Sequence, residues 1–251
     1  MKVVGVIPAR YNSTRFPGKP LAVIKGKTMI RRVCEQAWKS KLDAVVVATD
    51  DVRIADEVMG FGGQYVLTDP NHRSGTDRCR EALDLLENQY DAVINIQGDE
   101  PFIDPGQINL LVDLISREGV SLASLAKKIS DKDELFSPNA VKVVMDKDGK
   151  ALYFSRNPIP FIRNAERSEW LGKGTFYKHV GIYAYKAETL RQVARMQPSA
   201  LELAESLEQL RWLENGLLLH MAVIDVDGIS VDTPDDLRRA EQFAQNQYFS
   251  E

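Results

Sequence analysis

Short apolar segments alternate with amphipathic segments through the first hundred residues of this 251-residue chain. The apolar segments are rich in β-branched residues and cover 3–7, 43–49, 65–67 and 91–96, and the amphipathic segments cover 28–39, 52–59 and 75–87. Apolar runs of this length predict strands buried on both faces, and apolar residues at helical spacing predict helices. Repeated β-α units with right-handed crossovers build parallel sheets. The sequence therefore predicts an α/β fold with a mostly parallel mixed sheet and helices on both of its faces.

The second half of the chain departs from this alternation. After a helix over 105–118, strands are predicted at 121–126, 140–145, 151–154 and 177–185, and residues 146–149 have the composition of a hairpin turn. Residues 156–174 are interpreted as a loop or lid. Helices over 187–196 and 201–215, a strand over 220–226 and a helix over 234–246 follow. We expect a single domain, 1–251, with a small β-rich insertion at roughly 121–186.

Composition excludes several classes of protein. The chain has 32 Lys and Arg against 36 Asp and Glu, a net charge of −4 without long single-sign runs, which argues against general nucleic-acid binding. Its apolar stretches are too short for a membrane helix, and it enters a strand directly instead of a signal peptide. We expect a cytoplasmic protein in which Cys34 and Cys79 are free buried thiols.

Polar clusters follow the predicted strands at residues 8–19, 49–51 and 97–101. In open α/β sheets ligands bind outside the carboxyl ends of the strands. The first cluster carries Arg10, Arg15 and Lys19, and arginine forks with a lysine point charge suit a polyphosphate, although a solvated surface loop is the alternative. Read alone, this loop is suited to any polyphosphate.

Two carboxylates stand at positions where a site is expected. Asp99 follows a buried strand and can hold Mg²⁺, which prefers one or two carboxylates plus substrate phosphates. Asp232 lies just before the helix start at Thr233-Pro234, free to face a site. Helix or turn capping is the competing role for both, and Glu100 is a less certain neighbour. The triplet 225–227 resembles a glycosyltransferase metal motif, but its position near the carboxyl end disfavours that role.

Other phosphate and metal motifs fail in this sequence. Gly26-Lys27-Thr28 resembles the end of a Walker A loop, but Leu21 stands where that loop needs glycine. Residues 60–65 lack the last glycine of the dinucleotide fingerprint, and the aspartates of 146–149 are not followed by further EF-hand ligands.

Eight stretches, in order along nearly the whole chain, carry a specific resemblance: IPARYNSTRFPGKPL, VATDD, HRSGTDR, NIQGDEPFI, YFSRNPIPF, HVGIYAY, LELAESLEQLRWLENG and GISVDTPDDL. With them the sequence resembles the 3-deoxy-manno-octulosonate (Kdo) cytidylyltransferases, also called CMP-Kdo synthetases. The resemblance implies a Rossmann-like nucleotidyltransferase fold, a homodimer and Mg²⁺. It also implies transfer of CMP from CTP to the acid sugar Kdo for lipopolysaccharide biosynthesis.

The resemblance also implies roles at matching positions. The catalytic residues would be Arg10, Arg15, Lys19, Asp99 and Asp232, of which Asp99 and Asp232 bind the metal. The nucleotide would be bound by Pro8, Ala9, Arg10, Lys19, Arg73, Ser74, Gly75 and Asp77. The sugar would be bound by Gln97, Arg156, His179, Tyr183, Glu205, Glu208 and Gln209, with Arg156 as partner of its carboxylate, and the insertion would form the sugar site and the dimer contacts. Strand packing is the alternative role for His179 and Tyr183, and a solvated helix face is the alternative for Glu205 and Glu208.

The implied reaction is displacement at phosphorus, in which the anomeric hydroxyl of Kdo attacks the α-phosphorus of CTP and pyrophosphate leaves. The sequence offers no obvious general base for it. A related acid sugar, 8-amino-Kdo or sialic acid, is the alternative substrate. A catalytically dead nucleotide-binding or regulatory protein on the same fold is the alternative of a different class.

Overall fold

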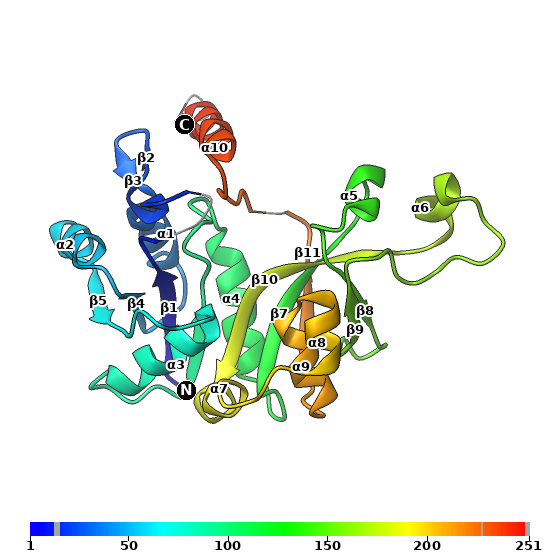
Figure 1. Cartoon of the computed structure of the whole chain (residues 1–251), viewed down its shortest axis with the longest axis horizontal. Helices are drawn as coiled ribbons and strands as arrows, with labels where there is room; N and C mark the ends of the chain where they lie inside the picture. Colours follow the sequence, from blue (N-terminus) through cyan, green and yellow to red (C-terminus); the bar gives the residue numbers. More distant parts are fainter. Residues whose placement is uncertain (13–15, 227, 249–251) are drawn as a thin grey trace. The chain divides into compact units, whose positions relative to one another are not determined.

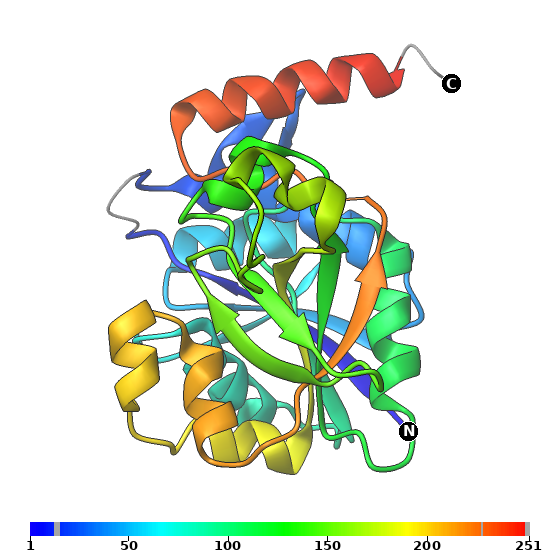
Figure 2. The ribbon, with the colours of Figure 1, turned by 90° about the vertical axis from the view of Figure 1, so that its right-hand side faces the viewer.

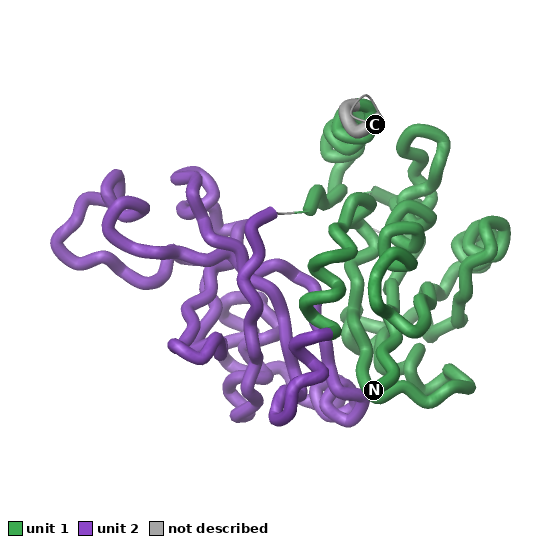
Figure 3. The backbone as a smooth tube through the Cα atoms, turned by 180° about the vertical axis from the view of Figure 1, so that it is seen from behind, with its two compact units in different colours: residues 1–112, 228–251 green, residues 113–227 purple. Residues whose placement is uncertain are grey.

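The computed structural model describes residues 1–12, 16–226 and 228–248 and divides the chain into two units (Figure 3). Unit 1 comprises residues 1–112 and 228–251, and unit 2 comprises residues 113–227. Arg15, one of the predicted catalytic cations, and Asp227 of the acidic triplet lie outside the described residues. Within the described part of the chain, no helix is long and apolar enough to cross a membrane.

Unit 1 contains a parallel sheet in the order β6-β1-β4-β5 (Figure 1). Its strands are β1 (Val3–Ala9), β4 (Ala44–Thr49), β5 (Gln64–Leu67) and β6 (Ala92–Asn95), connected by α1 (Met29–Ala37), α2 (Val52–Gly60) and α3 (Gly75–Leu85). In the register, Val4 of β1 lies opposite Ala44 of β4 and Val93 of β6. The predicted alternation of strands and helices is therefore confirmed in this half of the chain.

The strand order reverses direction once, between β1 and β6. The chain moves outward from β1 through β4 to β5, and α3 then returns it across the sheet to β6 on the other side of β1. Because crossovers are right-handed, α1 and α2 cover one face of the sheet and α3 covers the opposite face. The loops after β1 and β6 consequently diverge at this switch point, where ligands bind in sheets of this kind.

Strand β1 extends beyond the apolar segment 3–7 that predicted it and continues through Pro8 to Ala9. Val6 and Pro8 present their main-chain polar groups to the same side of the strand, and Ile96 N donates to Val6 O there at 2.9 Å. Pairing with β6 ends at Val6, so the missing N–H of Pro8 falls where no ladder partner is needed. On the other side β4 still pairs with β1, through Thr49 opposite Ala9.

The C-terminal segment of unit 1 packs against its N-terminal hairpin. The hairpin strands are β2 (Val23–Ile24) and β3 (Lys27–Thr28), and α10 (Pro234–Tyr248) lies beside them at the top of Figure 2. Between them a buried apolar cluster forms from Ile24, Met29, Val231, Ala240 and Ala244. This cluster connects the last part of the chain to the first.

Unit 2 contains strands in mixed parallel and antiparallel pairing. Strand β7 (Leu122–Lys128) pairs parallel with β11 (His220–Ile224) and antiparallel with β10 (Tyr177–Lys186), and β8 (Lys142–Met145) pairs antiparallel with both β10 and β9 (Ala151–Ser155). Helix α4 (Pro105–Ile115) leads into this unit, and α7 (Ala187–Val193) follows β10. The predicted strands of the insertion are confirmed.

Two predictions for the helices of unit 2 are wrong. The expected single helix over 201–215 is two helices, α8 (Ala200–Glu205) and α9 (Glu208–Glu214), because Ser206 adopts a left-handed conformation with φ 53°. Short helices also occur where none was predicted, α5 (Lys132–Phe136), η2 (Arg167–Glu169) and α6 (Trp170–Lys173). The last two lie in the predicted loop or lid, and Trp170 of α6 joins Ile129, Leu135 and Phe176 in a buried cluster.

Candidate active site

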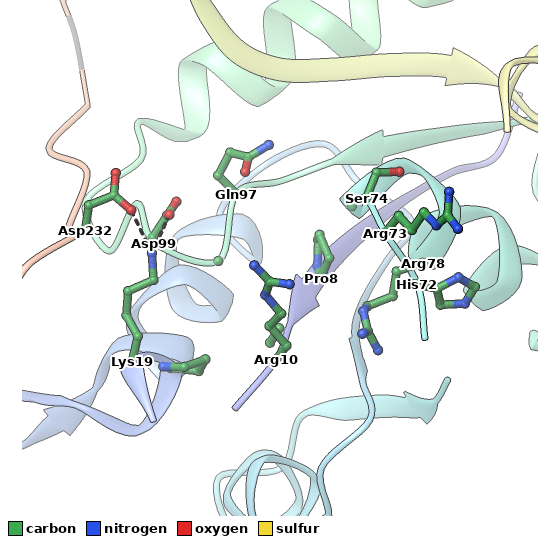
Figure 4. A pocket seen from close by; sticks show the side chains of 14 residues that line it. Pro8, Arg10, Lys19, His72, Arg73, Ser74, Arg78, Gln97, Asp99 and Asp232 are labelled. Atoms are coloured by element: carbon green, nitrogen blue, oxygen red, sulfur yellow. Dashed lines mark hydrogen bonds and ion pairs between the residues drawn. The ribbon is translucent and has the colours of Figure 1, made fainter. Parts of the chain in front are cut away.

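A pocket of about 320 Å³ opens in unit 1 where β1 and β6 end (Figure 4). This is the volume of a small-ligand site, and its position coincides with the switch point of the sheet. Three segments contribute most of its walls: the end of β1, the loop after β6 and the start of α3. Its lining residues are Pro8, Ala9, Arg10, Lys19, Pro20, His72, Arg73, Ser74, Gly75, Arg78, Gln97, Gly98, Asp99 and Asp232.

The loop after β6 approaches the end of β1 very closely. A Cβ added to Gly98 would lie 2.9 Å from the carbonyl oxygen of Pro8 and 3.5 Å from Cγ2 of Ile7. Only glycine therefore fits against the strand without displacing backbone. Both Pro8 and Gly98 line the pocket, so this contact fixes the spacing of two of its walls.

Lys19 enters the pocket from the short helix η1 (Lys19–Leu21), which a sharp turn places there. Gly18 adopts φ 73°, and its N–H donates to the carbonyl of Tyr11 at 2.8 Å, so the chain folds back at Pro17-Gly18. Lys19 Nζ donates to Asp99 Oδ2 at 2.7 Å and to Asp232 Oδ1 at 3.1 Å. The ammonium group of Lys19 therefore lies between the two carboxylates that are predicted to hold the metal.

Asp232 is held at the pocket by its neighbours in sequence. Val231 is buried, and its N–H donates to the carbonyl of Asp99 at 2.9 Å. Thr233 and Asp236 cap the helix reciprocally: Thr233 Oγ1 accepts from Asp236 N at 3.2 Å, and the Asp236 carboxylate accepts from the N–H groups of Asp232 and Thr233 and from the Thr233 hydroxyl. Burial opposes ionisation of Asp236, but these hydrogen bonds outweigh it and lower its pKa. Asp232 is thereby left to face the pocket, where it contacts Lys19.

The Asp99 and Asp232 pair fits a magnesium ion that also binds substrate phosphates. Both carboxylates lie within hydrogen-bonding distance of one atom, Lys19 Nζ, although 133 residues separate them in the sequence. No set of three or more His, Cys, Asp or Glu side chains gathers into a metal site among the residues that the structure describes. Oxygen ligands, few in number, match the preference of Mg²⁺ for one or two carboxylates with the remaining positions left to phosphate and water.

The start of α3 forms the other end of the pocket. Ser74 caps this helix by accepting a hydrogen bond from the N–H of Asp77 at 3.1 Å, and Gly75 is its first residue. Asp77, predicted to bind the nucleotide, lies in the first turn but is not among the residues lining the pocket. Its assignment stays a prediction.

Arg78 and His72 line the pocket without having been assigned a role from the sequence. Arg78 is buried, and its guanidinium donates to Thr68 Oγ1 at 2.5 Å and to Asp50 Oδ2 at 3.3 Å. His72 pairs with Glu81. Both belong to the HRSGTDR stretch, and the basic residues of that stretch were the signal in the sequence that would have indicated their place in the pocket.

Charge is distributed unequally along the pocket (Figure 4). Asp99 and Asp232 gather with Lys19 at one end, His72, Arg73 and Arg78 lie toward the other, and Arg10 lies between the two groups. A polyanion with a metal ion at one end matches this distribution, because the carboxylates attract the metal and the guanidinium groups attract the remaining negative charge.

In unit 2, two of the predicted sugar-binding residues form an aromatic cluster. The ring of His179 lies 5.1 Å from that of Phe154 and 5.2 Å from that of Tyr183, and Tyr183 contacts Trp212 edge to face. His179 Nε2 is 3.0 Å from Ser124 Oγ. Desolvation lowers the pKa of His179 to about 3 and, together with the charge of Glu208, raises that of Tyr183. Both side chains are therefore uncharged at neutral pH and can offer hydrogen bonds to hydroxyl groups.

Arg156 and Glu205 bond to each other's backbone. Arg156 Nε donates to the Glu205 carbonyl at 2.7 Å, and its terminal nitrogens donate to the carbonyls of Pro138 and Ser206 at 3.0 and 3.2 Å. The Glu205 carboxylate accepts from Ser155 Oγ at 2.7 Å and from Arg156 N at 3.0 Å. Glu205 is thus not a solvated helix residue, and Gln209 is buried. Their roles toward a sugar stay predictions.

The chain is similar to cytidylyltransferases over almost its full length. The family model described as cytidylyltransferase matches residues 4–223. The 3-deoxy-manno-octulosonate cytidylyltransferase of Parabacteroides distasonis is 52% identical over 250 residues, 98% of this chain and 99% of the relative. That of Thermodesulfovibrio yellowstonii is 49% identical over 249 residues, 96% of this chain and 98% of the relative. The chain belongs to the 3-deoxy-manno-octulosonate cytidylyltransferase family.

Solved structures agree with this membership. A CMP:2-keto-3-deoxy-manno-octonic acid synthetase complexed with CTP has a TM-score of 0.92 and 41% identity, covering 98% of this chain and 100% of its own. A putative glucose-1-phosphate thymidylyltransferase from Bacillus anthracis shares the fold, with a TM-score of 0.64 at 18% identity. The resemblance and the Rossmann-like nucleotidyltransferase fold inferred from the sequence are therefore confirmed.

Most of the predicted nucleotide and metal residues of this family member lie in the one pocket: Pro8, Ala9, Arg10, Lys19, Arg73, Ser74, Gly75, Asp99 and Asp232. Gln97, predicted for the sugar, lines it as well. The remaining sugar residues belong to unit 2.

Proposed function

We propose that the protein transfers CMP from CTP to the anomeric hydroxyl of Kdo and releases pyrophosphate, supplying CMP-Kdo for lipopolysaccharide biosynthesis. The observation that supports this reaction is the pocket at the switch point of the sheet, which is lined by a pair of carboxylates and several cations. The sugar is assigned from relatives about half identical over the full chain.

Asp99 and Asp232 are the proposed ligands of Mg²⁺. When bound there, the ion supplies positive charge to the α-phosphate of CTP. Arg10 and Lys19 would pair with the phosphate oxygens and stabilise the pyrophosphate as it leaves. The same role is expected of Arg15. Most of the rate enhancement in such a displacement comes from alignment and charge neutralisation, which fixed side chains at strand ends provide.

The nucleoside and the sugar are assigned to different residues. Pro8 and Ala9 would contact the cytosine, and Arg73, Ser74, Gly75 and Asp77 would lie near the base and ribose. Gln97, Arg156, His179, Tyr183, Glu205, Glu208 and Gln209 are the proposed sugar residues. A cytoplasmic homodimer, with dimer contacts in the insertion, is proposed from the family resemblance alone.

Turnover with a panel of sugars tests the function. Purified protein with CTP and Mg²⁺ should release pyrophosphate and form the CMP-sugar with Kdo, faster than with 8-amino-Kdo or sialic acid. Preference for another sugar would replace Kdo in the proposal. A protein that binds CTP but releases no pyrophosphate with any of them would instead be the catalytically dead alternative.

The role of Asp99 is tested by Asp99→Asn, an isosteric change that removes one charge of the carboxylate pair. The variant should fold normally and lose Mg²⁺-dependent turnover by at least about a hundredfold, the usual scale for an electrostatic group at a reacting phosphate. Unchanged turnover would remove Asp99 from the mechanism.

A further inference from the structure

The ammonium group of Lys19 occupies the position that a metal ion would share with the carboxylates. It lies 2.7 Å from Asp99 Oδ2 and 3.1 Å from Asp232 Oδ1, and the Lys19 side chain is only 15% exposed. The two carboxylates are 24% and 43% exposed, so this is a partly buried ion triad. Charge-assisted hydrogen bonds in such surroundings are stronger than those between exposed groups.

A divalent cation and this ammonium group compete for the same oxygens. If Lys19 stays in place, an ion arriving at the pair meets a like charge within a few ångströms and carboxylates whose charge is already half neutralised. If Lys19 leaves, its charge needs another anion, because an unpaired charge in a partly buried pocket is costly. The triphosphate is the anion that the proposed reaction brings to this pocket.

We propose that Lys19 couples the binding of the metal to the binding of the nucleotide. In the free enzyme Lys19 holds Asp99 and Asp232 together and keeps the metal affinity of the pair low. The phosphates of CTP then draw the ammonium group away, and the carboxylate pair becomes available to the ion. Metal and nucleotide therefore bind with positive cooperativity, and linkage requires each to raise the affinity of the other by the same factor. The inference rests on the proposed function, since it takes the carboxylate pair as the metal site.

The structure provides a matched control in the same unit. Lys27 Nζ pairs with Glu35 Oε2 at 2.7 Å, and this pair belongs to β3 and α1 and does not line the pocket. Lys27→Met therefore removes a lysine charge that pairs with a carboxylate outside the pocket, and it changes the net charge by the same amount as Lys19→Met.

The test is direct binding of Mn²⁺, used as a paramagnetic probe for Mg²⁺ and followed by electron paramagnetic resonance without nucleotide. Lys19→Met should bind Mn²⁺ about tenfold more tightly than the wild type, within the 5–150-fold range of typical coupling between sites. Lys27→Met should match the wild type. Lys19→Gln, which keeps a hydrogen-bond donor without the charge, provides a second variant in case the methionine variant unfolds.

Adding CTP separates this inference from the function on which it rests. CTP should raise the Mn²⁺ affinity of the wild type, measured above that of CTP alone in solution, and should raise that of Lys19→Met much less. Equal Mn²⁺ affinity of the folded Lys19 variants and the wild type without CTP would overturn the coupling. If Asp99→Asn binds Mn²⁺ with CTP as tightly as the wild type does, the proposed metal site itself is wrong.

Discussion

Replacing Gly98 by alanine tests whether the close approach of the loop after β6 to strand β1 sets the geometry of the pocket. The new Cβ would lie 2.9 Å from the carbonyl oxygen of Pro8, a backbone atom held in β1, so the strand or the loop must move by a few tenths of an ångström. Overpacking of this kind typically costs about 1–3 kcal/mol. The loss of a glycine from the unfolded chain offsets about 0.4–1 kcal/mol of that. The net expectation is a destabilisation on the order of 1 kcal/mol.

Activity should fall more than this loss of stability alone explains. The displaced atoms belong to Pro8 and Gly98, both in the pocket wall, and misplacement by 1 Å can cost about a hundredfold in rate. We therefore expect kcat/KM for CTP to fall roughly tenfold at a temperature where the variant is fully folded. Urea unfolding gives the free energy of unfolding, and pyrophosphate release gives the rate.

Gly60→Ala is the matched control. Gly60 is the last residue of α2, and a Cβ there would meet nothing within 4 Å. Alanine is better than glycine in a helix by about 1 kcal/mol, so this variant should be unchanged or slightly more stable, with normal turnover. If Gly98→Ala behaves like Gly60→Ala in both assays, the close approach to Pro8 does not control the site and the reasoning is refuted.

Three further predictions concern buried titratable groups. Because the pKa of His179 is lowered to about 3, below the 6.5 of the unfolded chain, the unfolded state takes up a proton first. Stability should then fall as pH drops below about 6.5, by up to about 1.4 kcal/mol per pH unit from this residue, and His179→Gln should flatten that slope in urea unfolding at pH 7 and 5. Burial raises the pKa of the Cys34 thiol to about 12, so Ellman's reagent at pH 8 should label it only after denaturation; rapid labelling of the native protein would contradict this. Lys142 is fully buried and donates to the carbonyls of Ser137, Ala140 and Arg156. Lys142→Met should therefore lower the free energy of unfolding in urea by about 3 kcal/mol or more. The control Lys147→Met, at a 90% exposed side chain, should leave it unchanged.

The fold of unit 1 could be predicted because its strands carry their signal locally. Parallel strands buried on both faces are apolar along most of their length, as 44–48 and 92–94 are, and no distant residue is needed to recognise them. The prediction of a single helix over 201–215 was wrong because a distant residue determines where that helix ends. Its apolar periodicity continues past Ser206, but the left-handed turn there is supported by Arg156, fifty residues earlier, which donates to the Ser206 carbonyl.

The candidate site likewise has a part that could be predicted from the sequence and a part that could not. Arg10, Lys19 and Asp99 could be placed near one another because each follows a strand whose carboxyl end faces the same edge of a parallel sheet. The ion triad of Lys19, Asp99 and Asp232 could not be predicted, because contacts between side chains far apart in the sequence depend on the folded structure. Lys19 was expected to bind phosphates, and in this structure it contacts the two carboxylates.

Asp232 shows what the sequence leaves open most clearly. Its residue type and its place before a helix suit capping, but the next residues cap the helix instead, because Thr233 and Asp236 bond reciprocally at its start. The segment reaches the pocket because Val231 is buried with Ile24, Met29 and the apolar face of α10, and because the Val231 N–H bonds to the Asp99 carbonyl. Half of the proposed metal site therefore depends on packing at the far end of the chain, while the loops that face the phosphates depend on β1 and β6. Loosening the α10 cluster should consequently weaken metal-dependent chemistry before it weakens nucleotide binding.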